Sequence, residues 1–219
     1  MSTPCRVSAR VVPLVALLGL GLAATAEAQP SGRRSAAEII ATIRAHGRIS
    51  AAISVLSQRD SAYARPVLDE LADSLTAMAV AADPEREGSD VALRVVGVLT
   101  DASSRYARVP YEGAAERLMR IHQQARDHAI RIVAFGSLLD LANIGRVLPY
   151  VRAFVASKQP SVDLAVSQII MRAEERSVLF RPEARALLRE LYEGNLVPDR
   201  DARLVLEAFA AEQGWSRRR

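Results

Sequence analysis

Aspartate recurs along this chain at a nearly constant interval. Asp90, Asp127, Asp163 and Asp199 follow one another at spacings of 37, 36 and 36 residues. An interval of this length accommodates two helices and a turn, and a unit of that size cannot bury a hydrophobic face on its own. The spacing therefore predicts a chain that builds its core by stacking similar units next to one another.

The residues after each aspartate repeat one face of a helix. After Asp127, the third, sixth and seventh positions are Ile130, Val133 and Ala134, and the same positions are apolar or glycine in the other copies. This spacing is typical of an amphipathic helix. The preceding helices of the last three units also repeat, at two positions that recur every 36 residues: Ala115, Val151 and Leu187, and Met119, Val155 and Leu191.

The composition favours helices over a sheet. Half of the residues are hydrophobic but only 5% are aromatic, so Ala, Leu and Val supply most of the expected core. No segment alternates with the period of two that indicates a strand. We therefore expect an all-α fold, a right-handed α-α superhelix (solenoid) of about five helix pairs. Its helices are expected at about 35–45, from 50 onwards, and at 65–81, 90–102, 112–125, 127–142, 146–157, 161–174, 182–193 and 199–212.

The repeated aspartates are predicted to cap helices. A carboxylate at the N-cap accepts a backbone N–H, which stabilises a helix by about 1 kcal/mol, and its charge suits the helix N-terminus. In three copies an arginine follows four residues later. These arginines either reach an aspartate of their own or a neighbouring unit, forming a ladder of charge-assisted hydrogen bonds, or stay in solvent beside an ordinary cap. The predicted structural caps are Asp90, Asp127, Asp163 and Asp199.

In this pattern the chain resembles HEAT-repeat proteins. The residues that carry the resemblance are three aspartate–arginine pairs: Asp90/Arg94, Asp127/Arg131 and Asp199/Arg203. Asp163 keeps half of the pattern, because Ser167 stands where the arginine is expected. The resemblance covers about residues 35 to 213. It implies an α-solenoid whose second helices line a concave side and whose end units are atypical because they cap the stack.

Residues 1–28 have the composition of a secretory signal. Arg6 and Arg10 precede an apolar run over 11–26, and a small-x-small triplet at 26–28 stands before Gln29. Such a segment is removed on export. In the alternative, residues 11–26 remain as an anchor, although the run is shorter than the roughly 20 residues that span a bilayer. We expect cleavage, no stable membrane insertion afterwards, and a periplasmic or extracellular protein.

The net charge of +4 does not come from the expected folded part. Outside residues 1–28 and the last three arginines, basic and acidic residues are equal in number. Nucleic-acid binding needs basic residues clustered on one face, so no nucleic-acid partner is predicted. The chain is expected to comprise a signal peptide (1–28), a polar lead-in (29–34), a HEAT-like helical-repeat domain (35–213) and a basic tail (214–219).

Little in the sequence indicates catalysis. The histidines are His46, His122 and His128, and the last two end one helix and begin its partner, so they are expected to approach each other. A zinc site needs three or four ligands, and Glu112 and Glu116 lie too far back along their helix to complete one. Neither a glycine-rich phosphate loop nor a nucleophile elbow is present. No catalytic residue, metal ligand or cofactor is therefore predicted.

The predicted partner surface combines one connection with the second helices of the pairs. Arginine and tyrosine dominate binding hot spots, and residues 105–111 contain two of each. Tyr106 has an alternative role, packing at the junction between units. The candidate surface residues are Arg105, Tyr106, Arg108, Tyr111, His128, Arg131, Gln168, Met171 and Arg203.

The sequence therefore predicts a non-enzymatic scaffold that binds a protein or peptide. Solenoids expose an extended surface suited to such partners, and the partner's identity stays open. The alternative is an enzyme, or an accessory subunit of one, built on the same frame with a cleft around His122 and His128.

Overall fold

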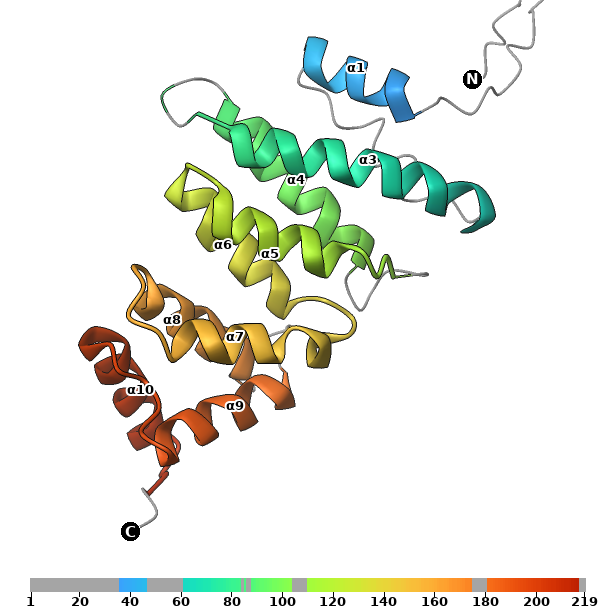
Figure 1. The fold of residues 1–219 in the computed structure, drawn as a ribbon. Helices are drawn as coiled ribbons and strands as arrows, with labels where there is room; N and C mark the ends of the chain where they lie inside the picture. The colour runs from blue at the N-terminus through green and yellow to red at the C-terminus, as the bar shows by residue number, and fades with distance from the viewer. Residues whose placement is uncertain are drawn as a thin grey trace, which may run out of the picture. The chain divides into compact units, whose positions relative to one another are not determined.

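The structure is a computed structural model that describes residues 36–46, 61–83, 85, 88–103, 110–174 and 181–216. Contacts divide the chain into two units, Met1–Arg33 and Arg34–Arg219, and every described residue belongs to the second. The described residues form helices joined by turns and loops, and no strand occurs among them (Figure 1). The prediction of an all-α fold is confirmed for this part of the chain.

The described part of the chain contains the following helices. In order they are α1 (Ala36–His46), α3 (Ser61–Ala81), α4 (Gly88–Ser103), α5 (Ala114–Gln124), α6 (His128–Leu139), the 3-10 helix η1 (Ile144–Arg146), α7 (Leu148–Val155), α8 (Val162–Ala173), α9 (Pro182–Glu193) and α10 (Arg200–Glu212). The helix expected from residue 50, the predicted signal segment over 1–28 and the lead-in over 29–34 lie outside the described residues. None of the described helices combines the length and the apolar composition needed to cross a bilayer.

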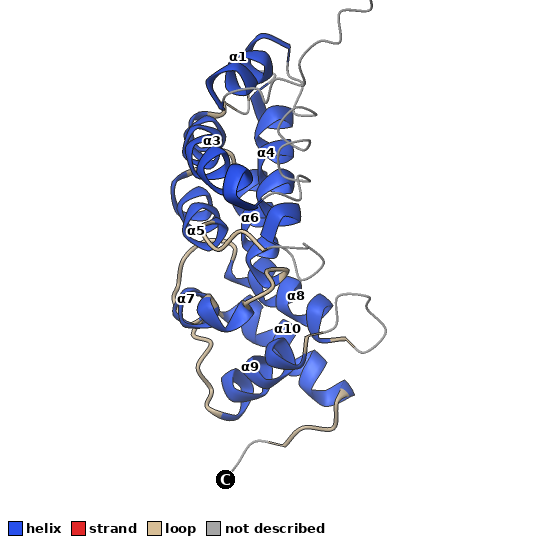
Figure 2. Cartoon of the chain, turned by 90° about the vertical axis from the view of Figure 1, so that its right-hand side faces the viewer, coloured by secondary structure: helices blue, strands red, loops and turns tan. Residues whose placement is uncertain are grey.

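Consecutive helices pack against each other in pairs. α3 packs on α4, α5 on α6, α7 on α8, and α9 on α10. The second members of these pairs also contact one another in chain order, α4 with α6, α6 with α8, and α8 with α10 (Figure 2). On the other side α1 packs on α3 and α3 on α5. Helices α4, α6, α8 and α10 are therefore each held both by a partner and by a neighbouring pair.

The repeated apolar positions supply the core. Ile130 and Ala134, on the face predicted after Asp127, have no exposed area, and neither does Ile169 in the next copy. Complete burial of a large aliphatic side chain contributes about 1.5–3 kcal/mol to stability. Val133 departs from the prediction, because it is 42% exposed although the corresponding Ile169 is buried. The repeat therefore fixes most of the buried face, while single positions differ between copies.

Two of the predicted caps are present in the structure. Asp127 stands at the N-cap of α6, where its Oδ1 accepts the backbone N–H of Ala129 at 2.8 Å. Asp199 caps α10 in the same way, accepting the N–H of Ala202 at 2.9 Å. Both aspartates have the extended backbone that N-caps require.

The predicted caps at Asp90 and Asp163 are wrong. α4 begins at Gly88 and α8 at Val162, so both aspartates lie inside the first turn of their helices. In α8 the N-cap residue is Ser161, which has a left-handed backbone with φ 72° and forms no side-chain cap bond. The two carboxylates still place negative charge near a helix N-terminus, which is favourable.

The ladder of aspartate–arginine bonds is absent from the described residues. Arg203 Nη2 donates to the carbonyl of Pro198 at 3.1 Å, and Arg94 is exposed. Arg131 forms no side-chain hydrogen bond or ion pair within the described part of the chain. α6 and α10 have the predicted caps, but their arginines do not stay in solvent as the second alternative expected, because Nε is buried in both Arg131 and Arg203.

A different charged cluster links neighbouring pairs. Asp140, at the C-cap of α6, forms a bidentate ion pair with Arg172 of α8, with an Nε–Oδ1 distance of 3.2 Å and an Nη2–Oδ2 distance of 3.0 Å. Only 11% of the Arg172 side chain and 16% of the Asp140 side chain are exposed. Arg181, just before α9, donates through Nη2 to the backbone carbonyls of Asp140 and Leu141. These bonds tie the end of α6 to the two helices that follow α7.

Candidate functional site

One residue of the predicted partner surface, Tyr111, is buried. Tyr111 is 8% exposed, and its hydroxyl donates to Asp69 Oδ1 at 2.7 Å while its backbone carbonyl accepts from the Ser103 hydroxyl. Burial and this hydrogen bond raise its pKa above the ordinary value of 10. Tyr111 therefore anchors the start of the α5 unit and is not available to a partner. Arg105, Tyr106 and Arg108 lie outside the described residues.

The remaining candidates belong to the second helices but differ in exposure. Met171 of α8 is 55% exposed and His128 of α6 is also exposed. Gln168 is partly buried, because its side-chain oxygen accepts a hydrogen bond from Arg172 Nη1. Arg203 donates to the backbone carbonyl of Pro198, which precedes α10. Of the nine candidates, His128 and Arg131 line the same cleft.

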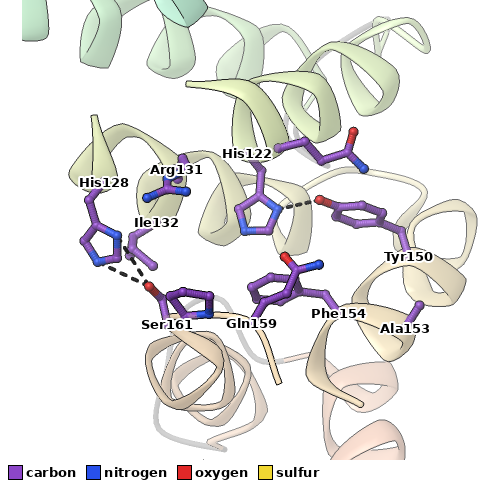
Figure 3. A pocket seen from close by; sticks show the side chains of 11 residues that line it. His122, His128, Arg131, Ile132, Tyr150, Ala153, Phe154, Gln159 and Ser161 are labelled. Carbon is purple, nitrogen blue, oxygen red and sulfur yellow. Dashed lines mark hydrogen bonds between the residues drawn. The ribbon is translucent and has the colours of Figure 1, made fainter. Parts of the chain in front are cut away.

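That cleft, called here the His122 cleft, has a volume of about 310 Å³ and opens to solvent (Figure 3). It lies where α5, α6 and α7 meet the connection that leads into α8. The residues that line it are His122, Gln123, His128, Arg131, Ile132, Tyr150, Ala153, Phe154, Gln159, Pro160 and Ser161. His122 and His128 both line this cleft, but no direct contact joins the two side chains among the interactions of the described residues, and their partners Tyr150 and Ser161 were not predicted.

His122 is held in a cage of aromatic rings. Its side chain is 6% exposed, and its ring centroid lies 4.5 Å from that of Phe154 and 5.2 Å from that of Phe135. The Phe154 and Tyr150 rings meet it edge-on. Nδ1 forms a hydrogen bond with the Tyr150 hydroxyl. Burial, and to a smaller degree the positive charge of Arg131, lowers the pKa of His122 to about 4, so the imidazole is neutral at physiological pH.

Tyr150 determines which nitrogen of His122 carries the proton. Burial raises the pKa of Tyr150 to about 12, so its hydroxyl keeps its hydrogen, whereas a hydrogen bond from Gln123 acts in the opposite direction. A phenol that keeps its hydrogen is able to donate it to an imidazole nitrogen. The Tyr150 hydrogen is then donated to Nδ1 of His122. We assign His122 as the tautomer that bears hydrogen on Nε2, which has no partner among the described residues.

On the other wall, His128 lies beside Ser161. The Ser161 hydroxyl oxygen is 3.4 Å from Nδ1 and 3.3 Å from Nε2 of His128, so it contacts both nitrogens at the long end of the hydrogen-bond range. The left-handed backbone of Ser161 turns its side chain away from the first turn of α8. For a residue other than glycine, this conformation costs on the order of 1 kcal/mol.

Arg131 brings a permanent positive charge to the cleft. Its Nε is buried without a hydrogen-bond partner. Arg117 and Arg203 also bury an unpartnered Nε, but Arg117 forms an ion pair with Asp73 at 3.0 Å and Arg203 binds a carbonyl. Arg131 therefore differs from them in having no acceptor within the described part of the chain. None of the described residues that line the cleft carries a carboxylate.

The chemistry available in the cleft is hydrogen bonding beside a positive charge. Two imidazoles, a guanidinium, a serine hydroxyl, a phenol hydroxyl and two amide side chains line one opening. Within the described residues, no group of three or more His, Cys, Asp or Glu side chains is arranged to hold a metal ion. The Ser161–His128 contact lacks an acidic residue among the described lining residues that would orient the imidazole, as nucleophilic triads require.

No protein-family model, no curated protein and no solved structure matches this chain. Its role has therefore to be inferred from its own helix packing and from the His122 cleft.

Proposed function

We propose that this chain is a HEAT-like right-handed α-solenoid of about five helix pairs that binds a protein or peptide and performs no catalysis itself. Support for the architecture comes from the contacts of α4, α6, α8 and α10 in chain order, together with the 36-residue repeat. A row of equivalent helices presents a long surface, and such a surface suits an extended protein segment better than a small molecule.

One observation carries the binding role: large apolar side chains are exposed on successive second helices. Met171 of α8 is 55% exposed, Leu204 of α10 is 54% exposed and Val133 lies on α6. Exposed apolar patches rimmed by polar residues mark interaction sites, and we propose that these side chains serve as anchors for the partner. The proposed partner is a protein or peptide rather than a nucleic acid, because the charges of residues 29–216 balance.

The proposed location is the periplasm or the cell exterior. Support comes from the signal-like composition of residues 1–28 alone. Mass spectrometry of the protein isolated from its native host should show a chain that begins at or near Gln29. A cytoplasmic protein that retains Met1 would contradict export.

The binding role is tested by replacing the exposed apolar residues with charged ones. Met171→Glu combined with Leu204→Glu should abolish capture of a specific partner from the envelope fraction, and the purified partner should then bind the unchanged protein directly. Leu196→Glu is the matched control, because Leu196 is 42% exposed but lies in the connection between α9 and α10. Equal capture by the double variant and the control would refute the proposed surface.

The second candidate is an enzyme or an accessory subunit of one, and the observation that favours it is the convergence of His122, His128 and Ser161 in one cleft. A hydrolytic enzyme of this kind would use Ser161 as nucleophile and His128 as base. Reaction of Ser161 with a fluorophosphonate, lost in Ser161→Ala and in His128→Ala, would favour the enzyme. Absence of labelling under conditions that label a known serine hydrolase would exclude this mechanism.

A further inference from the structure

Two hydrogen-bond donors that line the His122 cleft lack an acceptor among the described residues, and one of them, Nε of Arg131, is buried. Nε2–H of His122 and the guanidinium of Arg131 have no acceptor within the described part of the chain. Burying an N–H without an acceptor is costly, and the cost is larger when the group is charged. His122 and Arg131 line the same opening, so a ligand placed there meets both groups as hydrogen-bond donors (Figure 3).

The His122 nitrogen is held in position for such an acceptor. Tyr150 binds the opposite nitrogen, and Phe154 packs edge-on against the ring. The imidazole therefore cannot rotate freely without losing the Tyr150 bond. A preoriented donor loses less entropy when it binds a ligand than a mobile one does.

The start of α8 lies next to the opposite wall, which Ser161 lines. The first backbone N–H groups of a helix have no intrahelical acceptor, and the helix dipole favours negative charge there. Ser161 has a left-handed backbone and forms no side-chain cap bond, and the N-cap residues of α5, α7 and α9 also form none. The carboxylate of Asp163 in the same turn opposes a strongly charged anion, so the net preference is for a single negative charge.

A second cleft on the same domain shows that an exposed arginine alone does not make a site. It has a volume of about 290 Å³ and is lined in part by Arg146. There the guanidinium already approaches two carboxylates, Glu112 Oε2 at 3.9 Å and Glu116 Oε1 at 3.5 Å. In the His122 cleft the arginine has no such partner, so its charge is available to a ligand.

The rest of the lining is apolar. Ile132, Ala153, Phe154 and Pro160 line the cleft together with the polar groups. A volume of about 310 Å³ lies at the small end of ligand sites, which suits one functional group with one side chain rather than a nucleotide or cofactor. The ligand that matches both walls carries one acceptor-rich negative group attached to an apolar group.

We propose that the His122 cleft binds a carboxylate through Arg131 and Nε2–H of His122, and that this carboxylate is the C-terminus of a peptide with an apolar last residue. We choose a carboxylate as the bound group because the cleft offers hydrogen-bond donors and a single positive charge. The peptide as its source rests on the proposed function, in which an extended protein segment lies along the second helices. Terminal carboxylates are a recurrent recognition element in peptide-binding proteins.

The test compares four probes on the full chain by NMR titration. They are a tetrapeptide Gly-Gly-Val-Leu with a free C-terminus and an acetylated N-terminus, the same peptide as its C-terminal amide, benzoate, and inorganic phosphate. The free-acid peptide should shift the His122 and Arg131 side-chain signals and bind at least about ten-fold more tightly than the amide, since a charge-assisted bidentate contact is lost in the amide. Benzoate should bind more weakly, and phosphate should not bind measurably.

Three variants separate recognition from general charge. Arg131→Gln should weaken the free-acid peptide at least about ten-fold and leave the amide unchanged. Tyr150→Phe keeps the ring but releases Nδ1 of His122, so the Nε2–H tautomer should no longer dominate the imidazole nitrogen shifts and affinity should fall several-fold. Arg120→Gln removes an equal charge from α5, outside the cleft lining, and should change nothing.

Each outcome decides one part of the proposal. Equal affinity for acid and amide, an unaffected Arg131→Gln variant, tighter phosphate than benzoate, or binding of none of the probes would overturn the carboxylate site. If benzoate binds as tightly as the free-acid peptide and both depend on Arg131, the carboxylate site is established but the peptide as its source is refuted. Loss of partner capture in the Met171/Leu204 variant with unchanged carboxylate binding would show two separate functions on one domain.

Discussion

The charged pair between Asp140 and Arg172 offers a direct measurement of how much burial, rather than geometry, contributes to an ion pair. Its matched counterpart in the same chain is Arg152 with Glu190, which joins α7 to α9 through two hydrogen bonds of 2.9 Å. Both are bidentate arginine–carboxylate pairs of similar length. The side chains of Arg152 and Glu190 are 41% and 46% exposed, whereas those of Arg172 and Asp140 are 11% and 16% exposed.

The perturbation is the removal of one carboxylate charge at constant shape. Breaking a buried pair by removing one partner costs about 3–5 kcal/mol. In Asp140→Asn, Gln168 and the Gly136 carbonyl remain as acceptors for Arg172, so we expect a loss of about 2 kcal/mol. In Glu190→Gln, water hydrates the exposed Arg152 guanidinium in place of the carboxylate. The loss of unfolding free energy should therefore be about 0.5 kcal/mol or less.

Urea unfolding followed by circular dichroism at 222 nm measures both losses. The slope of the unfolding free energy against urea should stay constant, which shows that the variants unfold in the same cooperative unit. Added salt of about 0.5 M should remove the small Glu190→Gln effect by screening and leave most of the Asp140→Asn effect. Equal losses in the two variants would refute the reasoning, because geometry and not burial would then set the strength of the pair.

Three further outcomes follow from the helix starts and from His122. Asp127→Ala should lower the unfolding free energy by about 1 kcal/mol through the lost cap, whereas Asp163→Ala should cost less than half of that, and equal losses would contradict the assignment of caps. Ser161→Gly should raise stability by up to about 1 kcal/mol by relieving the left-handed backbone, and a lower urea midpoint would show that the contact with His128 matters more. The folded-state pKa of His122 lies near 4, below its unfolded value of 6.5, so His122 contributes stability above pH 6.5 that is lost as the pH falls toward 4. An imidazole NMR titration of His122 with a midpoint near 6.5 would contradict its burial.

The repeat allowed the helices and their buried faces to be predicted, because both depend on local spacing. Asp127 and Asp199 cap as expected since the carboxylate and the N–H groups lie within three residues. The predicted cap at Asp163 is wrong because α8 begins earlier, after Ser161. The left-handed backbone of Ser161 could not be predicted, because nothing in the sequence indicates it. Tyr111 was assigned to the surface because its residue type favours binding, whereas its bond to Asp69 joins positions 42 residues apart.

The candidate site shows where prediction from repeat position stops. Arg94, Arg131 and Arg203 occupy the same position in three copies, and the repeat treats them as equivalent. In the structure Arg94 is exposed, Arg203 binds a carbonyl, and Arg131 lies in a cleft without an acceptor. Arg131 differs because it lies beside a cleft that the neighbouring helix pair completes. That pair supplies Tyr150, which contacts His122 although the two residues are 28 positions apart in sequence. Similar units stack into a common frame, so a binding site arises at the position where one unit differs from its equivalents and the adjoining unit supplies the complement.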